Sequence, residues 1–193
     1  MKKVNNVAVG NVLIPNFKTI KQSSDHTSGP ACVKMVSDFF VVKEDAELNE
    51  RQISREVGAL PIFGASVRNM EKYFLTNNFI FECSLDRMKA GKKSKQKFKS
   101  VENLKSFALE NLSKGFPIIV EKVDKSGRWM IIVGYEAEGD IFIVADPAYC
   151  ETEESFVSVG AEGFFETWSN PKRKEEHLMQ PYFVIKGKKS LDI

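Results

Sequence analysis

Three polar residues, Ser28, Arg128 and Asp146, stand at the predicted ends of a helix and of two strands, where side chains can carry out chemistry. Ser28 opens the predicted helix, and a side chain there feels the positive end of the helix dipole, which favours an anion or a nucleophile. A residue at a helix start and a polar pair at strand ends are parts of a hydrolase site that uses a thiolate, an imidazole and an orienting acid. The simpler interpretation is a capped helix and a surface ion pair.

The stretch QSSDHTSGPACVKMVSDFF, residues 22–40, positions the first of these residues. Its later apolar residues recur at three- and four-residue spacing, which predicts a helix with one buried face over residues 28–40. Thr27 and Ser28 are good N-cap residues, and Pro30 falls in the first turn, where a proline is tolerated. The sequence therefore predicts a loop that delivers Ser28 onto the first turn of a buried helix.

A predicted hairpin positions the other two residues. Residues 129–135 and 141–145 are dense in Val and Ile, which is typical of strands, and a turn-rich connection joins them. If the hairpin pivots near residue 137, residues lie opposite each other when their numbers add up to about 274. The expected cross-strand pairs are Met130 with Val144, Ile132 with Phe142, and Arg128 with Asp146.

The remaining elements predict an α+β fold. Helices are expected at 50–57, 66–77 and 101–114, a short helix or turn at 162–168, and further strands near 12–14 and at 79–83, 117–123 and 182–186. Helices dominate the first 78 residues and antiparallel strands dominate the rest, which is the pattern of an α+β domain. We expect one domain over residues 1–193, with a helical part over about 15–78 and a sheet part over about 79–186.

Composition and charge exclude several classes of protein. The chain has 193 residues, of which 42% are hydrophobic, enough for one folded domain with a sizeable core. A net charge of +2 does not favour nucleic acid, and no apolar run is long enough to span a membrane. Cys32, Cys83 and Cys150 have no metal-ligand spacing and are odd in number. We therefore expect free buried thiols, no metal or cofactor, and a cytoplasmic protein.

The segment 87–99, RMKAGKKSKQKFK, contains seven basic residues and no acidic one. Such a run can bind nucleic acid or an acidic partner, although most runs of this kind are solvated loops. Only Phe98 supplies an aromatic ring, whereas stacking of bases uses several aromatic side chains. A solvated basic loop is therefore the expectation, and nucleic-acid binding is the alternative.

Three stretches carry a resemblance to a known family: QSSDHTSGPA from Gln22, GRWMIIVGY from Gly127, and VADPAY from Val144. Their order resembles that of the C39-like peptidases in the papain-like superfamily. In that family a Gln precedes the nucleophilic Cys of a CGPA motif by six residues, a GHW or HW motif opens a strand ending in Gly-Tyr, and an Asp-Pro ends the next strand. The resemblance covers the chain from about Pro15 to Ile185.

The resemblance implies a papain-like fold with an N-terminal helical lobe followed by an antiparallel sheet, and it implies roles for four residues. Gln22 would be the oxyanion-hole donor, Ser28 takes the nucleophile position, Arg128 the general-base position and Asp146 the position of the orienting acid. Two of the four depart from the family pattern, which has Cys and His where this chain has Ser28 and Arg128. A serine hydroxyl depends on a base more heavily than a thiol does, and a guanidinium keeps its proton. The resemblance therefore implies only weak residual catalysis.

Three other residues are weaker candidates for the chemistry. Cys32 lies one turn beyond Ser28 and fits the buried face of the helix as a small apolar residue. His26 lies two residues before Ser28, and His177 lies far from any motif. For both histidines an exposed or structural imidazole is the simpler interpretation. An engineered replacement of Cys by Ser would explain position 28 but not Arg128.

We therefore expect a pseudopeptidase that binds a peptide, a protein or a carboxylate ligand in the former active-site cleft, with no membrane association. One alternative is an active peptidase or acyl-transferase, with Ser28 as the nucleophile or as an engineered knock-out of a cysteine peptidase. The other is a binder of nucleic acid or an acidic partner through residues 87–99.

Overall fold

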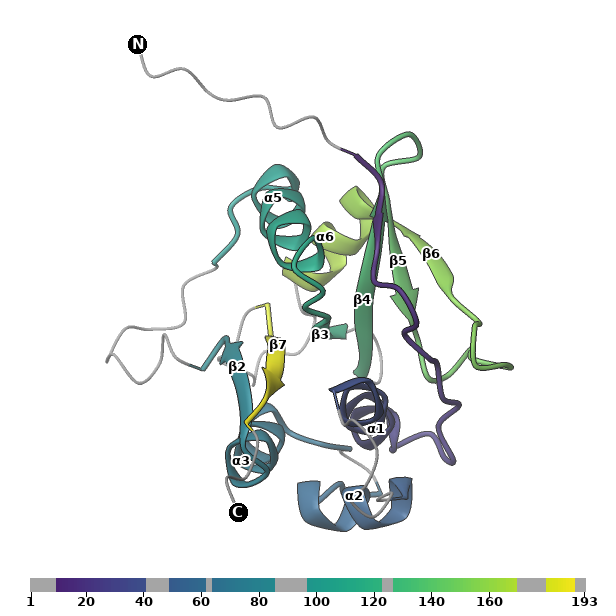
Figure 1. Ribbon diagram of the computed structural model, residues 1–193, viewed down its shortest axis with the longest axis vertical. Coiled ribbons are helices and arrows are strands. Elements are labelled where there is room, and N and C mark those ends of the chain that lie inside the picture. Colours follow the sequence, from purple (N-terminus) through teal and green to yellow (C-terminus); the bar gives the residue numbers. More distant parts are fainter. Residues whose placement is uncertain are drawn as a thin grey trace.

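The computed structural model describes residues 10–40, 49–61, 64–85, 97–122, 127–169 and 180–189. Within these residues the chain forms five helices and one antiparallel sheet of seven strands (Figure 1). The helices are α1 (Ser28–Phe40), α2 (Glu50–Val57), α3 (Val67–Thr76), α5 (Val101–Leu112) and α6 (Ala161–Ser169). The strands are β1 (Val12–Leu13), β2 (Phe79–Cys83), β3 (Ile118–Lys122), β4 (Arg128–Glu136), β5 (Ile141–Ala145), β6 (Val157–Gly160) and β7 (Tyr182–Lys188). The α+β fold that the sequence predicts is confirmed.

Strand β4 is the centre of the sheet, whose order is β2-β7-β3-β4-β5-β6. Strand β3 pairs with the first part of β4, and β1 pairs with Gly134 and Tyr135 further along it. Strands β1 and β3 both pair with the side of β4 that faces away from β5, because β5 pairs with β4 along both stretches. Strand β1 therefore follows β3 along the same side of β4, and Figure 1 shows the N-terminal segment running beside β4.

The boundaries of the N-terminal helices agree with the sequence periodicity. Helices α1 and α2 span the predicted residues, and α3 begins directly after Ser66, whose hydroxyl accepts a hydrogen bond from the Asn69 N–H at 3.2 Å. Strand β6 is the one described strand that the sequence analysis missed. Its four residues alternate between half-buried and exposed, so no buried face marks them in the sequence.

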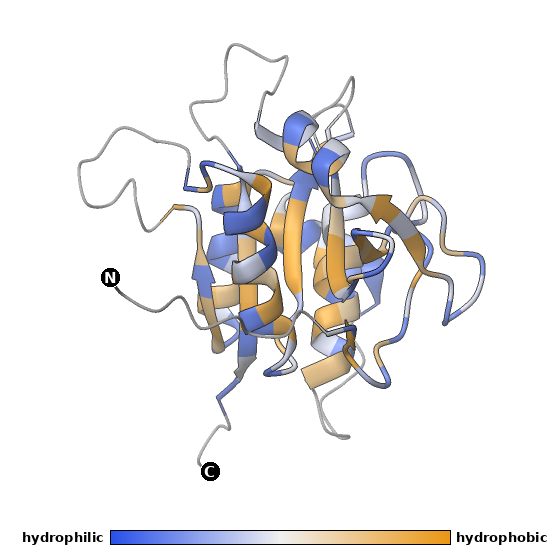
Figure 2. Cartoon of the chain, turned by 90° about the horizontal axis from the view of Figure 1, so that it is seen from above, coloured by the Kyte–Doolittle hydropathy of each residue, from blue (hydrophilic) through white to orange (hydrophobic). Residues whose placement is uncertain are grey.

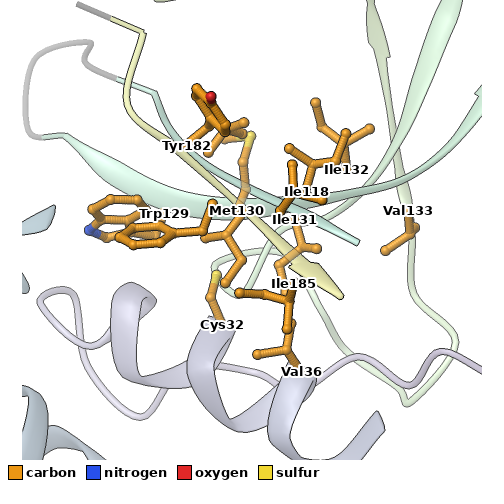
Figure 3. Close-up of a cluster of buried hydrophobic side chains, with 14 of the residues drawn as sticks. Cys32, Val36, Ile118, Trp129, Met130, Ile131, Ile132, Val133, Tyr182 and Ile185 are labelled. Atoms are coloured by element: carbon orange, nitrogen blue, oxygen red, sulfur yellow. The ribbon is translucent and has the colours of Figure 1, made fainter. Parts of the chain in front are cut away.

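Helices cover both faces of the sheet. On one face, Cys32 and Val36 of α1 point toward the strands, beside Ile185 of β7 (Figure 3). On the other face, the Tyr182 ring of β7 lies 5.5 Å from the ring of Phe107 in α5. Apolar residues fill the strands between these two helical layers, and the polar residues gather on the outer helix surfaces (Figure 2). The central strand β4 is therefore buried on both faces.

The register that we expect for the β4–β5 hairpin is wrong by two to three residues. Val144 pairs with Ile132 instead of Met130, and Phe142 pairs with Tyr135 instead of Ile132. The turn is centred later than residue 137, since the ladder begins with residue 136 opposite residue 141. An irregularity before residue 134 then adds one residue to β4, as a β-bulge does.

The close packing of α1 on β4 predicts that Gly29→Ala destabilises the fold. A Cβ atom at Gly29 would lie 2.7 Å from the Ala65 Cβ and 3.1 Å from the Trp129 Cδ1, which is too close for either neighbour to stay in place. We expect the free energy of unfolding to fall by roughly 1–3 kcal/mol, which is the usual cost of overpacking a core position. Urea denaturation at equilibrium measures this free energy.

Gly163→Ala in α6 is the matched control, because a Cβ there meets no atom within 4 Å. That helical substitution should raise the stability by roughly 0.5–1 kcal/mol, since alanine loses less conformational entropy than glycine. Equal behaviour of the two variants would contradict the close approach of α1 to β4.

Candidate functional site

The Ser28 hydroxyl joins the start of α1 to the start of β4. Its Oγ accepts a hydrogen bond from the backbone N–H of Trp129 at 3.1 Å, and both groups are buried. The β4–β5 ladder ends at the pair of Ile131 with Ala145, so β5 offers no acceptor to the Trp129 N–H. The Ser28 hydroxyl supplies that acceptor instead. Among the described residues this is the one hydrogen bond of the Ser28 side chain. The hydroxyl therefore has a structural role in this conformation.

Trp129 holds the same junction together from the strand side. Its indole Nε1–H donates to the Ala65 carbonyl at 2.9 Å, and its ring lies against Gly29. The sequence analysis gave Trp129 no role of its own, although it directly follows Arg128 in the GRW stretch. The contact brings Arg128, as the neighbouring residue, to the N-terminal end of α1.

Arg128 and Asp146 form an ion pair, with 3.0 Å between Arg128 Nη2 and Asp146 Oδ2. The two residues are not directly opposed, because the corrected register aligns Asp146 with Met130, and the long arginine side chain spans the diagonal. The Asp146 side chain is 4% exposed and the Arg128 side chain 26% exposed. The carboxylate also accepts a hydrogen bond from the Ala148 N–H at 3.1 Å. A buried carboxylate is thus compensated by a partly exposed cation.

Tyr149 is a site residue that the sequence analysis missed. Its ring centroid lies 5.0 Å from the Arg128 Cζ, and its hydroxyl lies 3.4 Å from Arg128 Nη1. The Tyr149 N–H donates to the Asp146 carbonyl at 2.9 Å, so one turn positions both the carboxylate and the ring. The signal was present in the VADPAY stretch, where an exposed aromatic follows the acid by three residues.

Gln22 lies beside the same turn, but its amide is directed into its own loop. The Gln22 backbone N–H donates to the Pro147 carbonyl at 3.0 Å, and its Nε2 donates to the Ser24 carbonyl at 2.8 Å. Its Oε1 is buried and has no hydrogen-bond partner among the described residues. The amide nitrogen carries a second hydrogen, which leaves one donor for a ligand.

Burial disfavours the thiolate form of the two cysteines near the site. Burial raises the pKa of Cys32 well above its usual value, and the charge of Asp146 raises it further. Burial also raises the pKa of Cys150, whose Sγ donates to the Asp146 carbonyl at 3.0 Å. Since a thiolate is the nucleophilic form, the raised pKa values disfavour both residues as a displaced nucleophile. Both are free and buried, as the sequence predicts.

The two histidines supply no base to Ser28 in the described residues. The His26 ring lies 3.3 Å from the Ser24 hydroxyl, within the loop that precedes α1. His177 falls outside the described residues. Neither histidine is therefore brought to the hydroxyl of Ser28 by a contact that the structure describes.

Most of the basic segment 87–99 also lies outside the described residues, and its last part is bound to the protein itself. Lys97 Nζ lies 2.7 Å from Glu82 Oε1 and 4.1 Å from the ring centroid of Phe107.

Within the described ranges, no helix is long and apolar enough to cross a membrane. In the same part of the chain, no three His, Cys, Asp or Glu side chains are grouped as metal ligands would be.

The burial of Asp146 predicts that loss of its partner is costly. Arg128→Met should lower the free energy of unfolding by roughly 2–4 kcal/mol, because it leaves a buried carboxylate without a cation. The double variant Arg128→Met/Asp146→Asn should regain at least half of this loss. Lys18→Met is the control, since the side chains of Lys18 and Glu153 form an ion pair that is 69% and 70% exposed, and its loss should lower the free energy of unfolding far less. Urea denaturation measures the free energy of unfolding of each variant. If Arg128→Met and Lys18→Met lowered it equally, the burial of the Arg128–Asp146 ion pair would be contradicted.

The raised pKa of Cys32 predicts that the native protein resists alkylation at this residue. Iodoacetamide at pH 8 should leave Cys32 unmodified in the folded chain and modify it in denaturant, as mass spectrometry of the digested protein would report. An exposed thiol introduced by Ser23→Cys serves as the reactive control. Alkylation of native Cys32 as fast as that control would show an accessible thiol of ordinary reactivity and would contradict both its burial and its raised pKa.

Comparisons with known proteins agree with this fold. The family model described as the Peptidase_C39 like family matches residues 14–175. Among solved structures, the chain is similar to the peptidase domain of Streptococcus ComA, a bi-functional ABC transporter involved in a quorum sensing pathway. The match has a TM-score of 0.56 and 12% identity, and it covers 88% of this chain and 98% of that domain, a likeness of fold alone. No curated protein matches. Because the family model spans most of its residues, the chain belongs to the Peptidase_C39 like family.

Proposed function

We propose that this chain is a pseudopeptidase, a C39-like protein that binds a peptide or carboxylate ligand without cleaving it. The observation that carries the proposal is the ion pair between Arg128 and the buried Asp146. By resemblance to the C39-like peptidases, Arg128 stands where the catalytic histidine belongs. An arginine cannot accept a proton from a nucleophile, because its guanidinium stays protonated in proteins.

The ion pair also changes what Asp146 does. An orienting acid in a hydrolase holds a neutral imidazole and stabilises the imidazolium that forms during the reaction. Here the carboxylate compensates a permanent cation at 3.0 Å, and a guanidinium, unlike an imidazole, cannot act as a base. The pair supports binding and stability instead of proton transfer.

The surroundings of Ser28 support the same proposal. Activation of a serine hydroxyl requires a base within hydrogen-bond reach. The hydroxyl instead accepts the Trp129 N–H, and the described contact of His26 is to Ser24. The dipole of α1 alone does not deprotonate an alcohol. A serine at this position is therefore an acceptor that closes the junction of α1 with β4.

The nature of the ligand follows from the charge that remains accessible. The Arg128 side chain is 26% exposed, and a guanidinium binds planar oxyanions such as carboxylates through paired N–H groups. A peptide is the ligand class that fits the family, and the solved relative is itself named as a peptidase domain. We therefore take a peptide that offers a carboxylate as the ligand.

Activity-based probes test the loss of catalysis. The native chain should not react with a peptide vinyl sulfone, which labels active thiols, or with a fluorophosphonate, which labels active serines. Ser28→Cys alone should label slowly, and Ser28→Cys/Arg128→His should label roughly 10²-fold faster, which is the usual contribution of a general base. Ser23→Cys/Arg128→His has a thiol in the preceding loop and should stay at the slow rate.

Two results would contradict the proposal in different ways. Peptide cleavage by the native chain that Ser28→Ala abolishes would establish an active serine enzyme. Fast labelling of Ser28→Cys with Arg128 unchanged would mean that the scaffold lacks only its thiol, as in an engineered knock-out. Binding is measured separately, by titrating short peptides into the isotope-labelled protein and following its amide resonances.

A further inference from the structure

Tyr149 is an exposed aromatic residue with no place in the hydrophobic core. Tyr149 is 58% exposed, and its ring centroid lies 5.0 Å from the Arg128 Cζ. The turn that begins at Asp146 fixes its backbone, through the bond from the Tyr149 N–H to the Asp146 carbonyl. Tyrosine combines an apolar ring with a polar hydroxyl and is enriched at binding interfaces, and here the ring lies beside an accessible cation.

The guanidinium beside this ring has donors that the described contacts do not use. An arginine has five N–H groups. Nη2 bonds to Asp146, Nη1 makes a long contact of 3.4 Å with the Tyr149 hydroxyl, and Nε is buried without a hydrogen-bond partner among the described residues. The terminal nitrogens therefore keep N–H groups available on the exposed side, where a carboxylate can accept them.

We propose that Arg128 and Tyr149 bind the C-terminal carboxylate of a peptide whose last side chain is apolar or aromatic. This inference rests on the proposed function and adds the part of the peptide that is recognised. In a C-terminal residue the carboxylate and the side chain branch from one Cα atom. The carboxylate can therefore contact the guanidinium while the side chain packs on the exposed part of the neighbouring ring.

A side-chain carboxylate from Asp or Glu has the same chemistry, and the geometry favours the chain end. The guanidinium and the ring are adjacent, with 5.0 Å between Cζ and the ring centroid. In an internal Asp or Glu the carboxylate lies at the tip of its own side chain, so the apolar contact must come from another residue. Recognition by both groups at once thus selects a C-terminal residue.

The test uses the unmodified protein and varies the ligand. The four probes are N-acetyl-Ala-Ala-Phe as the free acid, the same peptide as the C-terminal amide, N-acetyl-Ala-Ala-Ala as the free acid, and N-acetyl-Ala-Asp-Phe amide. We expect the first to bind best in an NMR titration that follows the Ala148 and Tyr149 amides. Both amides should bind roughly tenfold or more weakly, since each loses a charge-assisted hydrogen bond at the chain end.

Two variants of Tyr149 then separate ring from hydroxyl. Tyr149→Phe keeps the ring and should keep the preference for Phe over Ala at the peptide end. Tyr149→Ala should abolish that preference while the acid still binds better than its amide. Because Tyr149 is exposed, its replacement should leave the protein folded, and the NMR spectrum of each variant without peptide checks this directly.

Each other outcome has a definite meaning. Equal binding of acid and amide would overturn this inference and leave peptide binding by a pseudopeptidase intact. Tight binding of the Asp-containing amide would assign the site to side-chain carboxylates instead. If Tyr149→Ala kept the preference for Phe, the ring would have no role in recognition. Binding of none of the four peptides would contradict both this inference and the proposed function.

Discussion

The hydrogen bond from the Trp129 N–H to the Ser28 hydroxyl is the contact on which the candidate site depends. It joins two segments that lie 101 residues apart in the chain, and Gly29 makes it possible by letting α1 approach the indole closely. Because Arg128 directly precedes Trp129, the same contact sets the distance of the guanidinium from the helix start. It therefore links the helix start that carries Ser28 to the strand that carries Arg128.

The turn after β5 is the second support of the site, and the N-terminal segment holds it from outside. The Gln22 N–H donates to the Pro147 carbonyl, and the Thr19 hydroxyl donates to the Thr152 carbonyl at 2.6 Å. These bonds hold the N-terminal segment against the loop that carries the buried Asp146 carboxylate, and a buried carboxylate requires a cationic partner. Arg128 supplies that cation and thereby stabilises the fold. In the proposed function, the same guanidinium also contacts the ligand.

The likeness to the ComA peptidase domain extends over most of the chain at 12% identity, so the fold persists at low sequence identity, and a fold by itself does not determine chemistry. What the fold retains is a helix start, two strand ends and a loop that bring four polar residues into one region. Proton transfer depends on which side chains occupy these positions. A permanent cation such as Arg128 cannot accept a proton from Ser28, which is the physical basis of the proposed pseudopeptidase function.

The sequence by itself determined the helices and most of the strands, and it predicted the partnership of Arg128 with Asp146 from a hairpin register that the structure corrects. Periodicity, caps and turn residues act over a few neighbours, so α1 and α2 follow from short-range patterns. The hairpin register did not follow, because nearly all of β4 is buried, and a strand buried on both faces has no alternation that fixes its alignment. Only the tertiary structure decided that the Ser28 hydroxyl bonds to Trp129 and that Tyr149 lies on Arg128. Both contacts depend on how distant elements pack, which no local pattern of residues encodes.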